Sequence, residues 1–410
     1  MSLQMNPFKH TIMGLRKCFR GSGAAQAVAK AACITALAFL LSMLLISPFT
    51  ASTSAFFSSP EQEDFKFSDI YAQVADDRPV RQLDPNIVIL DIGNYNRGEI
   101  AQTLMYLSLC NPRAVGLDVL FAAPRDSAED AMLIDAVRSI PGIVLACAAN
   151  QVNPEGDSPV FAYGQRSFFT DSIAEGAAVD AATNLPSKGG HGRIRHFVTG
   201  FATPDGNEIP SFSGALASMV CPPEVLEKYN GKIANTVRYH SHEFTIIPAG
   251  ELPGRADEFD GKIVIVGSMN DAGDMHATPV NSYYPGALIH AHSLATMIDG
   301  ITYTMAPGWL DYVTAVLVCF VIVLLCISMK HMGRSMLVRV LQILLLVAAV
   351  TLGYSLFVER NIICNFSHTL LMIAFGLFSI DLWNGTAAIG RSIYNRLIIN
   401  KKSCIVPCKK

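Results

Sequence analysis

Charged residues are scarce in four long stretches of the 410-residue sequence, at 28–47, 309–329, 337–358 and 362–383. The first stretch carries no charge after Lys30. Each stretch has about the 20 residues that an α-helix needs to cross a hydrocarbon core about 30 Å thick. The sequence therefore predicts four transmembrane helices, one before and three after a polar segment at residues 50–308.

Acidic residues are absent from the segments that flank these stretches on one side of the predicted membrane. Residues 1–30, 330–339 and 384–410 together hold 14 Lys and Arg and no Asp or Glu. Residues 50–308 hold 16 Lys and Arg against 31 Asp and Glu. Because basic flanks are retained in the cytoplasm, we predict cytoplasmic segments at 1–27 and 384–410 and an external domain at 50–308.

A cleaved secretory signal is the alternative for the N-terminus, since a basic region and an apolar core precede the small residues at 51–55. Such a core usually has about 7 to 15 residues. The stretch at 28–47 is longer, so its length favours a membrane anchor.

Cysteines are few in the external domain, which holds only Cys110, Cys147 and Cys221. An odd number without regular spacing excludes a disulfide framework. We expect buried thiols, and the sequence leaves a bridge between Cys110 and Cys147 open.

Strand-like and helix-like patterns alternate through the first part of the external domain. Such alternation is typical of an α/β fold with a mostly parallel sheet and helices on both faces. The predicted strands are 87–92, 114–121 and 143–148, and the predicted helices between them are 99–110 and 128–139.

The pattern is less regular after residue 168, which indicates an antiparallel extension of the sheet. Residues 193–202 are expected to form antiparallel strands, and 236–247 an edge strand or hairpin. A buried strand at 262–267 and helices at 211–220 and 285–299 complete the prediction.

Sequence patterns of catalysis and nucleotide binding are missing. Ser213 and Ser268 lack the flanking glycines of a nucleophile elbow. The string GSMNDAGD at 267–274 is neither a phosphate loop nor a dinucleotide-binding fingerprint. The basic regions are the membrane flanks, so nothing indicates nucleic-acid binding. We predict no enzymatic activity, no cofactor and no nucleic-acid partner.

The densest set of metal-ligand residue types is Asp274, His276, His290 and His292. Carboxylate and imidazole groups would suit zinc or another divalent ion. His290 and His292 are two residues apart, however, and so diverge on a helix instead of sharing a face. We therefore predict no metal site and keep metal binding as the less favoured alternative.

Asp91 and Asp118 each lie near the end of a predicted strand. In open α/β sheets, ligands bind outside the carboxyl ends of the strands. Both aspartates are therefore candidate ligand-binding residues. The alternative, that they cap the loops or helices that follow, is left open.

Residues 259–300 contain a GKIVIVG strand, an aspartate before a Thr-Pro pair and a PGALIHA helix start. With AVGLDVLF, GRIRHFVTGF and SFSGALAS upstream, they resemble the second type of CHASE domain, a sensory extracellular domain of bacteria. The resemblance covers residues 50–308 and implies one membrane span before the domain and three after it. It also implies that Asp274 and Thr278 hold a loop through side-chain hydrogen bonds and that His290 lies near a helix start.

The resemblance implies a sensory protein of the bacterial inner membrane with a periplasmic ligand-binding domain. Family members commonly carry an output domain after the last span, whereas only 27 residues follow Trp383. We therefore expect a separate effector protein, and a homodimer would be consistent with this function. The alternative is a structural or scaffold subunit of a membrane or envelope complex that binds no small ligand.

The C-terminal segment has a pattern of its own. Ile389, Ile393 and Leu397 recur every four residues, with Arg391 and Arg396 between them. Residues 385–400 are thus predicted to form a basic amphipathic helix that lies on the inner leaflet, with docking to a partner as the alternative.

Overall fold

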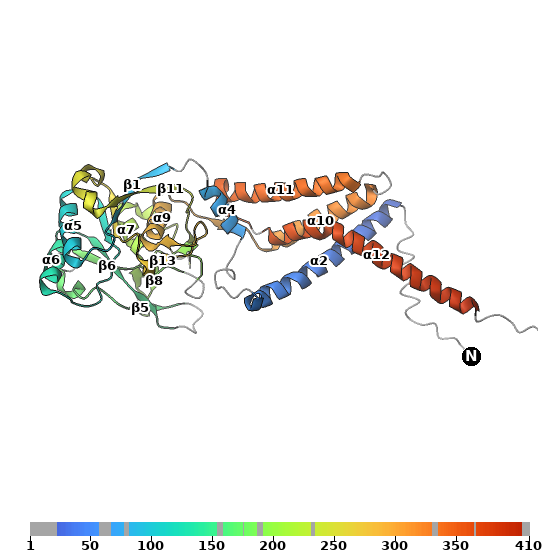
Figure 1. The fold of residues 1–410 in the computed structure, drawn as a ribbon, viewed down its shortest axis with the longest axis horizontal. Helices are drawn as coiled ribbons and strands as arrows, with labels where there is room; N and C mark the ends of the chain where they lie inside the picture. The colour runs from blue at the N-terminus through green and yellow to red at the C-terminus, as the bar shows by residue number, and fades with distance from the viewer. Residues whose placement is uncertain are drawn as a thin grey trace, which may run out of the picture. The chain divides into compact units, whose positions relative to one another are not determined.

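The computed structural model describes residues 23–56, 67–77, 82–153, 159–174, 176–186, 192–230, 234–329, 335–364 and 366–403 (Figure 1). The chain forms two compact units. One is an α/β unit at Ser59–Thr304, and the other is a helical unit made of Met1–Ser58 and Met305–Lys410.

The α/β unit is built on a six-stranded sheet in the order β11-β1-β12-β2-β3-β6. Every neighbouring pair of strands is parallel. The strands are β1 (Gln82–Asp91), β2 (Ala114–Leu117), β3 (Ile143–Cys147), β6 (Ala178–Ala182), β11 (His242–Pro248) and β12 (Ile263–Gly267). The predicted parallel sheet is confirmed.

Alternate residues of the sheet face two separate cores. Val88 and Leu90 of β1 contact one core, whereas Ile87 and Ile89 contact the other. Helices α5 (Arg97–Leu109) and α6 (Ser127–Arg138) contribute to the first core, and α7 (Phe212–Val220) and α9 (Gly286–Ile298) contribute to the second. The sheet is therefore covered by helices on both faces, as predicted. Its central strands are buried on both sides, which is why they are apolar throughout.

Local sequence signals fix the ends of these helices. Asn96 and Glu99 form a reciprocal capping box at the start of α5, and the Asp126 carboxylate accepts two backbone hydrogen bonds at the start of α6. Gly116 of β2 permits close packing of α7, since a Cβ atom there would lie 2.6 Å from the Phe212 ring.

The antiparallel strands predicted at 193–202 are present, but the prediction that they extend the main sheet is wrong, because the described antiparallel strands form separate two-stranded sheets. Residues 242–248 form one parallel edge strand, within the segment predicted as an edge strand or hairpin, and residues 178–182 form the other, which was not predicted. Edge strands are half-exposed and so lack the continuous apolar run of central strands. The small sheets pair β4 (Ala149–Gln151) with β5 (Phe161–Tyr163), β7 (His196–Phe197) with β10 (Asn235–Thr236), β8 (Gly200–Ala202) with β9 (Glu208–Pro210), and β13 (Met275–His276) with β14 (Tyr284–Pro285).

Several short helices complete the α/β unit. Helix α4 (Phe67–Asp76) was not predicted. The others are α8 (Pro223–Leu226), η1 (Thr170–Ser172), η3 (Ala249–Gly254), η4 (Ala256–Glu258) and η5 (Ala272–Asp274). Cys110 and Cys147 are both free thiols and lie in different apolar clusters, so the bridge that the sequence left open is absent from this structure.

The helical unit contains α2 (Gly23–Phe56), α10 (Trp309–Met329), α11 (Ser335–Arg360) and α12 (Ser367–Ser403). Among the described residues, three helical segments are long and apolar enough to cross a membrane: Gly23–Met43, Trp309–Ser328 and Arg339–Arg360. Helix α12 offers a shorter apolar stretch, Ser367–Gly376, so the fourth span stays a prediction.

The start predicted for that fourth span, residue 362, is wrong, because Ile362–Ile363 form a short strand, β16. The Ile363 carbonyl accepts a hydrogen bond from the Ala306 N–H, close to β15 (Thr304–Met305). Helix α12 begins only where the Asp311 carboxylate accepts the N–H groups of His368 and Thr369, each at 3.0 Å. From there it runs as one helix through the segment 385–400.

Candidate functional site

The loop that follows β12 leaves the sheet on one face, whereas the loops that follow its two neighbouring strands leave it on the other. Strands β1 and β2 lead into α5 and α6 on one face, whereas β12, which lies between them, leads into α9 on the other. Connections that diverge in this way open a crevice at the carboxyl edge of a parallel sheet, which is where such folds bind ligands. The candidate site is the side chains at this edge.

Asp91, the last residue of β1, supports one wall of the site. Its Oδ1 atom accepts the Gly93 N–H at 2.9 Å and the Met269 N–H at 3.0 Å. Because Met269 follows β12, this carboxylate ties the loops after two neighbouring strands together. Asp91 thus takes the loop-capping role that the sequence left open as an alternative.

Asp118 directly follows β2, and its backbone N–H donates to the Val266 carbonyl at 2.8 Å. Gly267 lies beside it, where a Cβ atom would be 3.5 Å from the Asp118 Cβ and 3.2 Å from the Ala287 Cβ. The glycine therefore lets α9 approach this carboxylate. Burial, reinforced by the charge of Asp274, raises the pKa of Asp118 to about 8. Asp118 is therefore mostly protonated at neutral pH and can donate a hydrogen bond.

Asp274 lies at the N-terminus of α9. A Cβ atom at Gly286, the first residue of α9, would overlap both carboxylate oxygens of Asp274. Pro285 provides no side-chain cap for this helix, and a carboxylate here interacts favourably with the positive end of the helix dipole. Asp274 Oδ1 also lies 3.1 Å from His276 Nε2. The predicted loop-holding role of Asp274 thus has a geometric basis at the helix start.

His290 lies in the second turn of α9 and is 4% exposed. Its ring centroid is 5.0 Å from that of Phe212, and it hydrogen-bonds the main chain of Thr183. Burial lowers the pKa of His290 to about 4, although the charge of Asp274 opposes the shift. The imidazole is therefore neutral at physiological pH.

Thr278 is fully buried, and its backbone forms a turn with Asn281. Its hydroxyl donates to the Asn281 carbonyl at 2.9 Å, and Arg193 Nη1 donates to the Thr278 carbonyl at 2.8 Å. The charge of Asp274 thus raises the pKa of Asp118 and opposes the lowered pKa of His290, whereas Asp91 and Thr278 hold the surrounding loops. Ligand binding by these residues remains a prediction.

His290 and His292 have separate surroundings, as their spacing indicated. His292 Nε2 lies 2.8 Å from the Tyr284 hydroxyl, and its ring contacts Tyr239 and Phe244. In the part of the chain that the structure describes, no three His, Cys, Asp or Glu side chains are grouped to hold a metal ion.

Sequence reasoning missed a partly buried carboxylate-histidine cluster at the other end of α9. His242 Nε2 lies 3.0 Å from Oδ2 of Asp299, the residue that caps α9, and His242 Nδ1 lies 3.6 Å from Asp84 Oδ2. The hydrogen bond to Asp299 is the main reason why the pKa of His242 is raised. Since the three residues are far apart in sequence, no local motif could reveal them.

Comparison with known proteins gives one match. A family model described as the CHASE2 domain matches residues 49–327. No curated protein and no solved structure matches the chain.

Proposed function

Because the chain belongs to the CHASE2 domain family, whose members are sensory extracellular domains, we propose that its α/β unit senses a small ligand and signals through the membrane helices. The family implies an extracellular ligand in general terms. The charge bias of the flanks supports both termini in the cytoplasm and the α/β unit outside it, and we propose that the membrane is a bacterial inner membrane. We propose that a separate effector protein receives the signal.

The observation that carries this proposal is the group of carboxylates at the start of α9. Asp118 is mostly protonated at neutral pH, since burial and the charge of Asp274 raise its pKa to about 8. A cationic group placed between them would favour the ionised form of Asp118. The chemistry therefore suits a ligand with an ammonium group or several hydrogen-bond donors, and binding would release a proton.

Helix α9 links this site to the rest of the chain. It begins beside Asp274 and ends at Ile298, about ten residues before α10 starts at Trp309. A ligand can shift the equilibrium between two states only through a difference in its affinity for them. We propose that the two states differ in the position of α9 and that α10 follows it.

The test is thermal unfolding of the full chain in detergent with a panel of amino acids and aliphatic diamines. A probe at about 100 times its dissociation constant should raise the midpoint by about 5–10 °C. Asp118→Asn should abolish this shift, measured from its own baseline. Asp135→Asn is the matched control, because Asp135 is exposed and forms only a surface pair with Arg138. A panel without any shift, or equal shifts in both variants, would contradict the proposed site.

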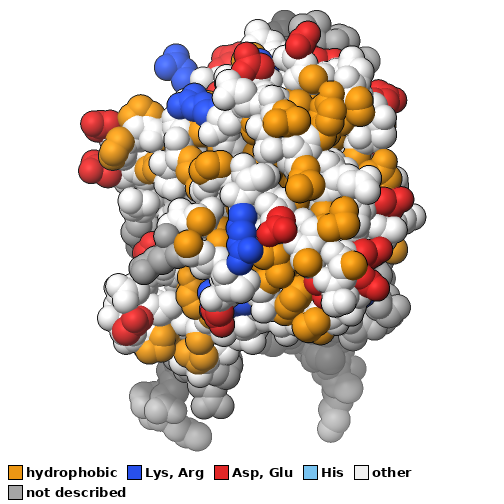
Figure 2. Space-filling view, turned by 90° about the vertical axis from the view of Figure 1, so that its left-hand side faces the viewer, with side chains coloured by type: hydrophobic (Ala, Val, Ile, Leu, Met, Phe, Trp, Pro, Cys, Tyr) orange, Lys and Arg blue, Asp and Glu red, His pale blue; other side chains and the backbone are white. Residues whose placement is uncertain are grey.

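A scaffold function is the second candidate, and exposed apolar residues on α5 favour it. Met105, Tyr106 and Leu109 are 44%, 37% and 80% exposed. Figure 2, which views the end of the α/β unit that carries α5, shows hydrophobic side chains interspersed with charged ones. A scaffold would show no ligand shift, and Leu109→Glu would release a subunit that co-purifies with the unmodified protein. Neither function requires catalysis, and we propose that the protein has none.

A further inference from the structure

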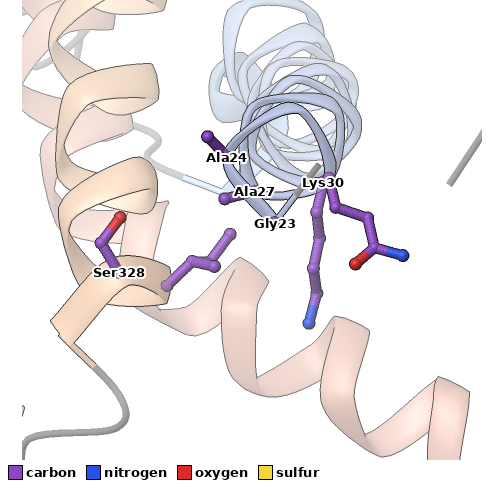
Figure 3. A pocket seen from close by; sticks show the side chains of 7 residues that line it. Gly23, Ala24, Ala27, Lys30 and Ser328 are labelled. Carbon is purple, nitrogen blue, oxygen red and sulfur yellow. The ribbon is translucent and has the colours of Figure 1, made fainter. Parts of the chain in front are cut away.

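The helical unit contains a cavity of about 600 Å³ between α2 and α10. It is lined by Gly23, Ala24, Gln26, Ala27 and Lys30 of α2 and by Ile327 and Ser328 of α10. Figure 3 shows Ala27 on the side of α2 that faces Ser328, with the Lys30 side chain extending from the next turn. The cavity is within the range of about 300–1,000 Å³ that is typical of small-molecule sites.

The cavity arises from the sequence of the α2 packing face. Further along this face, Ala31, Ile34 and Ala38 are fully buried in a cluster that includes Ala315, Cys319 and Val323 of α10. Ala24 and Ala27 continue the same face at helical spacing, but their side chains are too small to fill the space against Ile327. Packing between the two helices is therefore tight along their length and open at this end.

The position of the cavity indicates what fills it. It lies where α2 begins and α10 ends, so it is at the end of both candidate membrane spans. The positive-inside pattern assigns this end to the cytoplasmic leaflet, which carries the anionic lipids. Lys30 is the only basic residue of α2, and basic pockets between helices on this side suit anionic lipid headgroups.

We propose that this cavity binds the headgroup of an anionic phospholipid. Lys30 contacts the phosphodiester, and Gln26 offers a hydrogen bond to the glycerol part. The Ser328 hydroxyl, which donates to the Leu324 carbonyl at 2.8 Å, accepts one from a headgroup hydroxyl. The small residues leave room for the headgroup between the helices. This site is independent of ligand sensing by the α/β unit, and it would make the packing of α2 against α10 sensitive to lipid composition.

Native mass spectrometry of the full chain in micelles containing equal amounts of phosphatidylglycerol and phosphatidylcholine tests this site. The unmodified protein should retain phosphatidylglycerol preferentially, and Lys30→Gln should reduce the preference about fivefold, the effect of one basic residue near an anionic surface. Ala27→Phe should abolish the preferential retention of phosphatidylglycerol, because it fills the cavity without changing the charge. Glycerol phosphate should not compete, because it lacks acyl chains.

Arg339→Gln is the matched control, because it removes a positive charge from the same predicted side of the membrane at an exposed position that does not line the cavity. It should leave the preference unchanged. Equal retention of both lipids by the unmodified protein would overturn the proposal. Equal losses in Lys30→Gln and Arg339→Gln, or competition by glycerol phosphate as strong as that by the lipid, would overturn it too.

Discussion

Buried charges have different partners in the α/β unit and in the helical unit. In the α/β unit, Arg195 forms a two-point ion pair with Asp69 at 2.7 and 2.6 Å, and both side chains are almost fully buried. In the helical unit, Asp311 is 4% exposed, and it is satisfied by the N–H groups and side chains at the start of α12.

The difference follows from what each carboxylate holds in place. Asp69 lies on α4, which is separated from Arg195 by more than a hundred residues, and the ion pair fixes this short helix to the domain. Asp311 instead caps the N-terminus of a long helix, where backbone groups have no partner within the helix. In the proposed membrane location, water is absent from the bilayer core, so a carboxylate near it must find all its partners in the protein. The two clusters should therefore respond differently to substitution.

Arg195→Ala is expected to have the largest effect on stability. It leaves the Asp69 carboxylate buried without its cation, which typically costs about 3–5 kcal/mol. Urea unfolding of the purified chain, followed by circular dichroism, measures this loss. Arg138→Ala, which removes an exposed arginine, should cost less than about 1 kcal/mol. A small loss for Arg195→Ala would mean that the ion pair is not needed to hold α4.

Asp311→Ala should have a smaller and more local effect, because loss of a helix cap costs about 0.5–2 kcal/mol. Hydrogen exchange should rise at residues 366–372, whereas the sheet of the α/β unit should be unaffected. Asp381→Asn is the control, since Asp381 is exposed on the same helix. Faster exchange throughout α10 and α12 would instead show that the Asp311 cluster holds the entire helical unit together.

The strands with continuous apolar runs, β1, β2, β3 and β12, and the amphipathic helices of the domain could be predicted from the sequence. The edge strand β11 lies within the segment predicted as an edge strand or hairpin, 236–247. The edge strand β6 and helix α4 could not be predicted, because their short segments are defined by tertiary pairing. The site shows the same limit. Asp91 contacts Met269 only because β12 inserts between β1 and β2, and sequence spacing does not contain that order. Likewise, Asp118 and Asp274 were proposed on separate grounds, and only the fold shows that they interact.

The stability of the α/β unit should depend on pH through His242. Its pKa is raised above 6.5, mainly by the hydrogen bond to Asp299, with further contributions from the charges of Asp299 and Asp84. Burial and the charge of Arg238 oppose the shift. A raised pKa in the folded state means that the stabilisation is complete below the unfolded pKa and is lost as pH rises through the folded one.

Urea unfolding of the full chain from about pH 6 to about pH 8.5 measures this dependence. The difference in stability between the unmodified chain and His242→Asn should shrink as pH rises. His276→Asn is the comparison, because His276 pairs with Asp274 but is partly exposed. A difference for His242→Asn that is constant with pH would show that the cluster is not held by charge.

The smallest effect is expected at the start of α9. Asp274→Ala removes a carboxylate from the positive end of this helix and its contact with His276, each worth about 1 kcal/mol or less. Gly286 has no side chain that could replace these interactions, so residues 286–298 should exchange faster with solvent. Residues 87–121 should be nearly unchanged, because their sheet hydrogen bonds do not depend on Asp274. Equal acceleration in both segments would show that Asp274 supports the whole domain, and no change in either would remove it from the proposed link between the ligand site and α9.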